Sequence, residues 1–187
     1  LSLIGPSGGG KSSFLMALLE KHHSSSQTRA ALAPQQPKLL PNMTALENIA
    51  LASPKAETKR IGSLMEIFGL ESSLLERSAG LLSGGQHSRI QLIQLLMIPN
   101  LRLLLLDETW SALDEPLRHK LIPKVRKLTA VEGIAVITVS HNQQEAYWYS
   151  EYCSYCQEFE VTEPRNTKQF FEEPEKKVES FLVVGHG

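Results

Sequence analysis

The 187-residue sequence predicts an α/β fold with a mostly parallel central sheet and an inserted helical subdomain. Two observations predict the sheet. Short apolar runs alternate with stretches of helical periodicity, as in parallel sheets covered by helices. The run "LRLLLLDE" is almost continuously apolar up to its two carboxylates, as in strands buried on both faces. A third observation predicts the insert, because helical signals replace the alternation between residues 42 and 80.

The first predicted element is the strand "LSLIG", which enters a glycine-rich turn and is followed by a helix in "KSSFLMALLEK". Residues 22–30 are polar and predict a loop, after which "ALAP" predicts a short strand ending at a proline. Leu1 already has the pattern of a strand's end. We therefore expect that strands preceding it are missing from this sequence.

The middle of the chain predicts several short helices. Thr44 with Glu47 three residues later has the pattern of a capping box, which marks a helix start. Helical signals continue to about Ser78, with interruptions near Pro54 and Gly69. This segment, residues 42–80, is the predicted helical subdomain.

The second half returns to alternating elements. A helix is predicted over residues 83–98, where Pro99 ends it, and "LRLLLLDE" follows as a buried strand. Asp114 can cap a further helix, and "IAVITVSH" predicts the next buried strand. We thus divide the single domain into a core formed by residues 1–36 and 80–160, the helical subdomain 42–80, and a helical tail, 161–187.

Composition excludes several classes of protein. With 19 Lys+Arg against 20 Asp+Glu, the chain lacks the basic excess of nucleic-acid-binding domains, and no nucleic-acid partner is expected. Its apolar runs are far shorter than the roughly 20 residues of a membrane-spanning helix, and no signal peptide opens it. These features predict a cytoplasmic protein.

The two cysteines, Cys153 and Cys156, have CxxC spacing. This spacing occurs in redox motifs and in halves of zinc sites, but no second pair follows. The aromatic residues around them favour a strand instead, so a structural interpretation is preferred.

The segment "GPSGGGKS" has the spacing of a phosphate-binding loop, in which a glycine is followed by four residues and then Gly-Lys-Ser. Glycines let backbone N–H groups surround a polyphosphate, Lys11 can meet its β and γ oxygens, and Ser12 can offer a hydroxyl to Mg²⁺. The candidate nucleotide-binding residues here are Gly5, Pro6, Ser7, Gly8, Gly9, Gly10, Lys11, Ser12 and Ser13.

Asp107 and Glu108 follow the buried strand at the end where parallel sheets bind ligands. One carboxylate there can hold magnesium through water, and its neighbour can polarise an attacking water. Beside a phosphate-binding loop, the pair predicts a hydrolytic site.

Together these segments resemble the nucleotide-binding domain of ATP-binding cassette (ABC) proteins, which are P-loop ATPases. "GPSGGGKS" resembles their Walker A motif, "LRLLLLDE" resembles Walker B, and "LSGGQ" at residues 82–86 resembles the ABC signature. In the same order, Gln35 resembles the Q-loop glutamine, "SALD" at residues 111–114 the D-loop, and His141 the switch histidine. The resemblance covers nearly the whole chain.

The resemblance implies ATP and Mg²⁺ as cofactors and assigns roles to individual residues. Glu108 would be the general base, His141 would contact the γ-phosphate, and Gln35 would reach the metal and the attacking water. The implied magnesium ligands are Ser12, Gln35 and Asp107. The implied contacts to nucleotide held by an opposite subunit are Ser83, Gly84, Gly85 and Gln86. Asp114 of the D-loop is a further implied nucleotide-binding residue, and its other interpretation is a helix cap without that role.

These roles imply the ATPase subunit of an ABC transporter, working as a homodimer or heterodimer with a second ATP-binding subunit. A transmembrane permease and a substrate-binding protein are the further expected partners, with the chain peripheral on the inner face of the membrane. The sequence looks most like importer subunits, particularly of the polar amino-acid class. The alternatives are a soluble ABC ATPase of DNA repair or translation, and a regulatory module that binds nucleotide without turnover.

The chain also departs from the family pattern. Members usually carry, before Walker A, an aromatic residue that stacks on adenine, and none stands in the four residues given before this motif. We expect either that adenine binding is weak or that the segment is missing from this sequence. The usual proline after Walker B is replaced by Thr109 and Trp110. We expect the bulky Trp110 to alter the dimer-facing turn.

Overall fold

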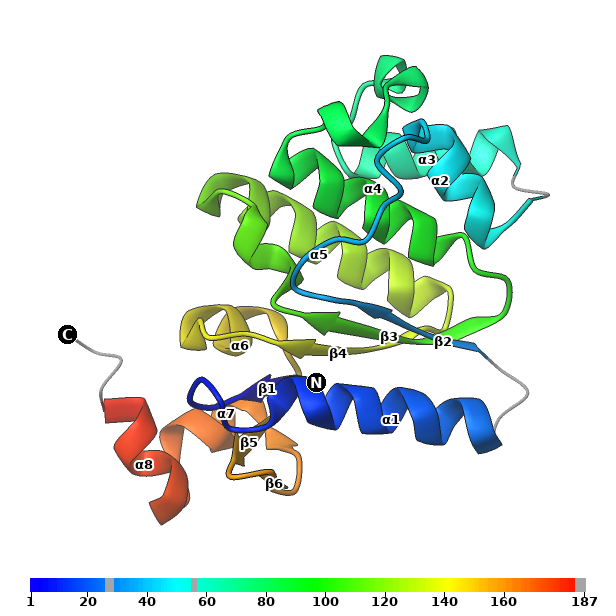
Figure 1. The fold of residues 1–187 in the computed structure, drawn as a ribbon. Helices are drawn as coiled ribbons and strands as arrows, with labels where there is room; N and C mark the ends of the chain where they lie inside the picture. The colour runs from blue at the N-terminus through cyan, green and yellow to red at the C-terminus, as the bar shows by residue number, and fades with distance from the viewer. Residues whose placement is uncertain (26–28, 55–56, 184–187) are drawn as a thin grey trace.

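The computed structural model describes residues 1–25, 29–54 and 57–183, and Figure 1 shows its ribbon. The first half of the chain contains β1 (Ser2–Ile4), α1 (Lys11–Ser25), β2 (Arg29–Ala33), α2 (Ala45–Ala52), α3 (Thr58–Ile67), the 3₁₀ helices η1 (Ser72–Glu76) and η2 (Ala79–Leu81), and α4 (Gly84–Leu96). The second half contains β3 (Leu101–Asp107), the 3₁₀ helix η3 (Thr109–Ala112), α5 (Glu115–Val131), β4 (Ala135–Val139), α6 (Gln143–Tyr149), β5 (Tyr152–Gln157), β6 (Glu160–Val161), β7 (Arg165–Asn166), α7 (Thr167–Glu172) and α8 (Lys176–Val183).

The strands of the described residues form a sheet in the order β2-β3-β4-β1-β5-β6, with β7 pairing with β5. Five neighbouring strands, β2, β3, β4, β1 and β5, pair in parallel. The short strands β6 and β7 each pair antiparallel with β5. The predicted α/β fold with a mostly parallel sheet is therefore confirmed. Since β1 lies between β4 and β5, the glycine-rich turn that follows it lies in the middle of one sheet edge.

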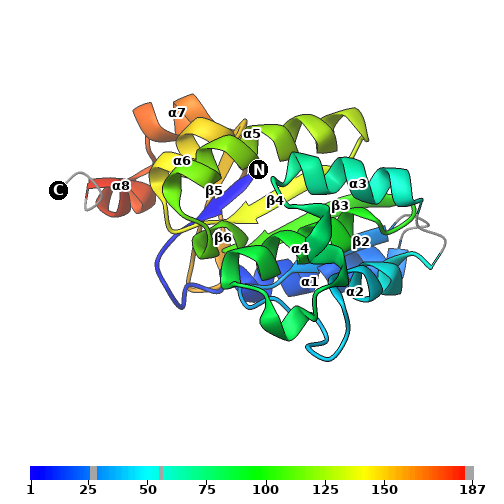
Figure 2. The same ribbon diagram turned by 90° about the horizontal axis from the view of Figure 1, so that it is seen from above.

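Helices cover both faces of the sheet, as Figures 1 and 2 show. Alternate side chains of β3 point to opposite faces. Leu105 belongs to the core cluster that contains Leu15 of α1, whereas Leu104 and Leu106 belong to the cluster that contains Ile90 of α4. The helices α1 and α4 therefore lie on opposite faces of the sheet.

The helical segment begins as the sequence predicts. The Thr44 hydroxyl accepts a hydrogen bond from the Glu47 N–H (3.1 Å), and the Glu47 carboxylate accepts one from the Thr44 N–H (2.7 Å), which completes the capping box. The chain leaves α2 at Ser53 in an extended conformation, and Gly69 after α3 has φ +61°. Both predicted interruptions are confirmed.

Two local predictions need correction. The loop predicted for residues 22–30 is shorter, because α1 continues to Ser25 and β2 begins at Arg29, while residues 26–28 lie outside the described residues. The tail 161–187 is not purely helical, since β6 ends at Val161 and β7 precedes α7. Pairing with β5 selects the strand conformation there, and residues 184–187 lie outside the described residues. The division into core, subdomain and tail stays a prediction.

Within the described residues, none of the helices combines the length and the apolar character that crossing a membrane requires.

A buried asparagine attaches the segment after β2 to the helical subdomain. Asn48 of α2 is completely buried, and its side-chain oxygen accepts a hydrogen bond from the Leu40 N–H at 2.7 Å. Its amide nitrogen donates to the carbonyl oxygens of Leu40 (3.1 Å) and Thr44 (3.0 Å). One buried side chain thus forms hydrogen bonds with several backbone groups of the preceding segment.

Asn48→Ala should lower the free energy of unfolding by about 2 kcal/mol, because the Leu40 N–H loses its hydrogen-bond partner and the Leu40 and Thr44 carbonyls each lose one of their two donors. Urea unfolding followed by circular dichroism measures the change. The matched control is Ser63→Ala on α3, whose exposed hydroxyl bonds only to the carbonyl of its own helix. Equal unfolding midpoints for both variants would contradict the assigned role of Asn48.

Candidate functional site

The glycine-rich turn of residues 5–10 connects the centre of the sheet to the N-terminus of α1. Gly5 has φ +152°, and a Cβ atom there would lie 2.0 Å from the carbonyl oxygen of Cys156, so no larger residue fits. The turn is followed by a helix of 15 residues. The free N–H groups and the dipole at such a helix start attract anions, especially phosphate.

Lys11 begins this helix, and its side chain folds back over the turn. The residue is 5% exposed, and its ammonium donates to the carbonyl oxygens of Gly5 (2.9 Å) and Pro6 (2.7 Å). Burial lowers the pKa of Lys11, and the negative charge of the nearby Glu108 opposes that shift. The following residues, Ser12 and Ser13, are exposed. The turn therefore presents one buried cation together with accessible hydroxyl groups.

The carboxylates of β3 lie at the same edge of the sheet. Asp107 is buried, and its Oδ1 atom has no hydrogen-bond partner within the described part of the chain. Glu108 has φ +49° and ψ +24°, a left-handed conformation that is costly for a residue with a side chain. Its N–H donates to the Val139 carbonyl (3.1 Å), and its carbonyl accepts from the Ser111 hydroxyl (2.6 Å).

The three residues predicted as catalytic meet at this edge. The Gln35 amide nitrogen donates to Glu108 Oε2 at 2.9 Å, and the His141 ring pairs through Nε2 with Glu108 Oε1. They follow β2, β3 and β4, which are neighbours in the sheet. Both oxygens of one carboxylate are thus engaged by side chains from strands that are distant in sequence.

The residues at this edge also fit a magnesium ion. The Asp107 Oδ1 atom, which has no hydrogen-bond partner, and the hydroxyl of the exposed Ser12 are oxygen ligands of the kind that Mg²⁺ prefers. The Gln35 side-chain oxygen is a further potential metal ligand. No cluster of three or more His, Cys, Asp or Glu residues gathers as a metal site in the described residues. Mg²⁺ commonly takes only one or two carboxylates and completes its shell with phosphate oxygens and water, so the fit requires a bound phosphate.

The signature residues lie elsewhere. Ser83 caps α4 by accepting from the Gln86 N–H (3.3 Å), and the Gln86 side chain returns to the Ser83 N–H (3.0 Å). Ser83 and Gly84 are exposed. The helices α4 and α1 lie on opposite faces of the sheet, so the signature residues and the glycine-rich turn before α1 belong to different layers. In the described structure, no hydrogen bond links residues 83–86 to residues 5–13.

Sequence reasoning missed the arginine that holds this helix in place. Arg89 donates from Nε to the Gly85 carbonyl (3.0 Å) and from its guanidinium to the carbonyls of Phe68 (3.0 Å) and Gly69 (3.2 Å). It thereby attaches the signature helix to the end of α3. The signal available in the sequence was the position of Arg89, one helical turn after Gly85.

The turn after β3 leaves two expectations open. Trp110 is 5% exposed and packs into the main core cluster, and its expected effect on the dimer-facing turn stays a prediction. Apolar neighbours under α5 bury it there. The Asp114 carboxylate accepts from the Leu117 N–H at 2.8 Å and caps α5. Its nucleotide contact stays a prediction.

A second region that sequence reasoning missed contacts the glycine turn from β5. The Cys156 thiol donates to the Gly9 carbonyl (3.2 Å), and the same oxygen accepts from the Phe159 N–H (3.0 Å). The contacts join segments about 150 residues apart, and the segment has no turn residue such as Gly or Asn to signal it. No sequence signal marked this contact.

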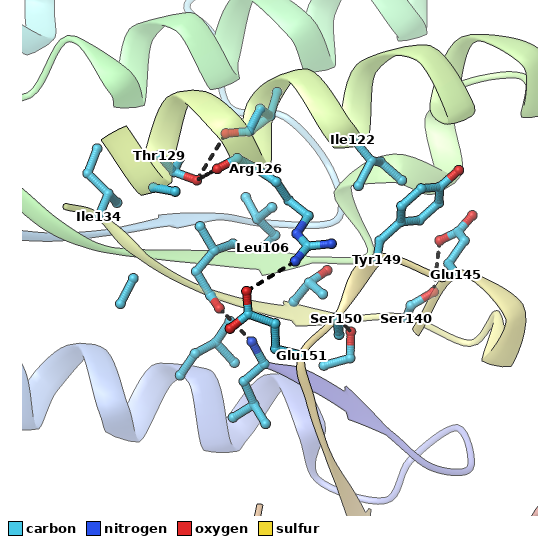
Figure 3. A pocket seen from close by; sticks show the side chains of 18 of the residues that line it. Leu106, Ile122, Arg126, Thr129, Ile134, Ser140, Glu145, Tyr149, Ser150 and Glu151 are labelled. Carbon is cyan, nitrogen blue, oxygen red and sulfur yellow. Dashed lines mark hydrogen bonds and ion pairs between the residues drawn. The ribbon is translucent and has the colours of Figure 1, made fainter. Parts of the chain in front are cut away.

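A cavity of about 690 Å³ lies away from the glycine turn. Figure 3 shows it between α5 and the sheet, lined by Leu106, Ile122 and Ile134 and by the Arg126–Glu151 ion pair. A smaller hollow of about 90 Å³ is lined by Glu108 and His141. The smaller hollow, together with the glycine turn, is the candidate site, because the polar side chains of Glu108 and His141 converge there.

The family model described as "ABC transporter" matches residues 1–111 of this chain. The chain is similar to the spermidine/putrescine import ATP-binding protein PotA of Ruegeria pomeroyi, with 34% identity over 80% of this chain and 46% of the relative. It is also similar to the Fe(3+) ions import ATP-binding protein FbpC of Pseudomonas fluorescens, with 31% identity over 80% and 49% of the two chains. The chain spans about half the length of these curated relatives.

Among solved structures, the dimeric structure of MJ0796, a bacterial ABC transporter cassette, is similar to this one with a TM-score of 0.74 and 25% identity. The similarity covers 89% of this chain and 84% of that chain. The P-loop type of α/β fold and the family resemblance predicted from the motifs are both confirmed.

The structural interpretation of the cysteine pair is also confirmed, because both residues lie in β5. Residues three apart in a strand point to opposite faces. Cys153 accordingly packs with Ile4 and Phe170, and Cys156 packs with Leu3 and Leu15. Both thiols are free, and burial raises the pKa of each.

The two thiols should therefore react with a disulfide reagent such as DTNB about ten-fold or more slowly in the native protein than in guanidinium chloride. A raised pKa lowers the thiolate fraction, and burial blocks access. Thiol titration at mildly alkaline pH measures the rates. Rapid native reaction, or formation of a disulfide between the two cysteines under mild oxidation, would contradict the strand geometry.

Proposed function

The chain belongs to the ABC transporter family, and on that premise we propose that it binds and hydrolyses ATP as the nucleotide-binding subunit of a transport system. The observation that carries the proposal is the meeting of Gln35, Glu108 and His141 beside the buried Lys11. This arrangement combines a phosphate-binding cation with an oriented carboxylate at one edge of the sheet.

We assign the triphosphate to the turn between β1 and α1. Backbone N–H groups of residues 8–12 and the α1 dipole attract the β and γ oxygens. On binding, the Lys11 ammonium exchanges its bonds to the Gly5 and Pro6 carbonyls for bonds to phosphate oxygens. Because the ammonium is held by uncharged acceptors, the incoming anion gains a charge-assisted hydrogen bond without breaking an ion pair.

Asp107, Ser12 and Gln35 are the residues that would hold Mg²⁺, which neutralises charge on the phosphate oxygens when it is bound. The proton-accepting role falls to Glu108. Its carboxylate orients an attacking water toward the γ-phosphorus and accepts the proton that this water loses. Gln35 and His141 fix the carboxylate from either side, so little reorganisation is needed.

We propose that the site is completed by a second copy or a paralogous subunit. Residues 83–86 expose a hydroxyl and backbone groups at the start of a 13-residue helix, while their own phosphate turn lies in a different layer. A two-fold arrangement would place the signature of each subunit against the nucleotide of the other. ATP would then stabilise the dimer and hydrolysis would release it.

Similarity to import ATP-binding proteins supports a role in import, with a transmembrane permease as the partner and the chain peripheral on the inner side of the membrane. A substrate-binding protein would complete such a system. The two relatives are named for spermidine/putrescine and Fe(3+), so the polar amino-acid class stays a prediction without support from them. The assembled Glu108 and His141 pair disfavours a nucleotide-binding module without turnover.

Glu108→Gln should retain ATP binding and lose hydrolysis by at least about 100-fold, because an amide cannot accept the water's proton. With turnover blocked, the ATP-bound dimer should accumulate, as measured by light scattering. Lys11→Ala is the control, because it should prevent both binding and dimerisation. Hydrolysis at the wild-type rate by Glu108→Gln would remove the assigned base.

Mixing two inactive chains, Ser83→Arg and Lys11→Ala, should restore ATPase activity above that of either variant alone, since each mixed dimer contains one intact composite site that can bind ATP. Phosphate release measures the rate. The control is each variant alone at the same total concentration. No gain on mixing would show that the signature does not act across the subunits.

A further inference from the structure

The turn between β5 and β6 packs an aromatic side chain against the glycine turn. Gln157 pairs with Glu160, which leaves Glu158 and Phe159 as a two-residue hairpin loop. The Phe159 N–H donates to the Gly9 carbonyl at 3.0 Å. A Cβ atom on Gly10 would lie 2.7 Å from Cδ1 of the Phe159 ring, so the ring lies directly against the Gly10 backbone.

This ring is presented to solvent although it has apolar surface to bury. Phe159 is 74% exposed, and it lies on the turn beside the predicted triphosphate site. One exposed apolar residue alone is common and needs no explanation. Phe159, however, lies against Gly10, which directly precedes Lys11, and this position makes its ring relevant to nucleotide binding.

The backbone of the same residue gives an independent observation. Glu158 has φ +51° and Phe159 has φ +65°. Hairpin loops with two positive φ angles strongly prefer Asn and Gly, because other side chains are strained there. A phenylalanine in this conformation costs stability, and strain of this kind is retained where the side chain has a function.

We propose that Phe159 is the stacking surface for the nucleobase of the nucleotide bound at the glycine turn, an inference that rests on the proposed function. The hairpin segment, residues 157–161, contains two carboxylates, of Glu158 and Glu160, and no cation. In the described part of the chain, Lys177 lies beside the hairpin and forms an ion pair with Glu160, at 3.5 Å. These charges repel phosphate, so the part of the nucleotide that fits the hairpin is the uncharged ring.

Stacking accounts for the exposure of the ring. A nucleobase covers the aromatic face when it binds and removes apolar surface of both partners from water. Because every base has such a face, the surface favours a purine or pyrimidine ring without selecting one base. Phe159 therefore contributes affinity for nucleotides and little discrimination between ATP and GTP.

Calorimetry with ATP and with inorganic tripolyphosphate separates the ring from the phosphates. Phe159→Ala should weaken ATP binding about ten-fold and leave tripolyphosphate binding unchanged, while Phe159→Trp keeps the ATP affinity. Tyr152→Ala is the matched control, because Tyr152 is a half-exposed aromatic residue at the opposite end of β5. Both of its affinities should equal those of the wild type.

A second variant keeps the test independent of folding. Phe159→Gly removes the ring and also the left-handed strain, so the thermal unfolding temperature should be unchanged or higher while ATP affinity falls. A fall in unfolding temperature together with equal losses for ATP and tripolyphosphate would show that the ring merely supports the glycine turn, and would overturn the inference.

The two levels of proposal fail in different ways. If Phe159→Ala binds ATP as tightly as the wild type while Lys11→Ala does not bind it, the stacking inference is overturned and the proposed function stands. If Lys11→Ala also binds ATP normally, the proposed function itself is overturned.

Discussion

Parallel pairing of β1 between β4 and β5 positions all the functional segments of the core. Parallel strands bring their carboxyl ends to one edge of the sheet, and every functional segment of the core follows such an end. The glycine turn follows β1, the two acids follow β3, and Gln35 and His141 follow β2 and β4. Residues that are up to about 135 positions apart thus face the same small volume.

Charge is balanced locally at this edge. Lys11 is buried without a salt bridge among the described residues, held by backbone carbonyls, and the nearby Glu108 opposes the effect of burial on its pKa. The Asp107 oxygen has no partner there either. A buried cation and an orphaned anion are costly in isolation, and a magnesium-bound phosphate would satisfy both. The left-handed backbones of Glu108 and Phe159 add strain at the same edge.

The opposite placement of α1 and α4 gives a physical basis for pairing of subunits. The start of α1 follows the glycine-rich turn, and the start of α4 carries the exposed signature residues. The sheet separates the two helices, so a single copy does not bring the signature to its own phosphate turn. Arg89 fixes the signature helix to the helical segment, so movement of that segment would carry the signature with it.

Features that depend on neighbours along the chain could be predicted from the amino-acid sequence. The Thr44 capping box, the buried strand ending at Asp107 and the glycine spacing before Lys11 all rest on hydrogen bonds or periodicities within a few residues. The motifs also indicated which side chains belong to one site. Their order in the sheet was not encoded in any local pattern.

Contacts between distant segments became evident in the three-dimensional structure. It buried Trp110 under α5, extended α1 into a polar stretch, and placed the Phe159 turn against Gly9 and Gly10. Such contacts follow from strand order and layer packing, which depend on the whole chain at once. A strained, exposed phenylalanine far from the glycine motif has no local signature, so its position became evident only when β5 was paired beside β1.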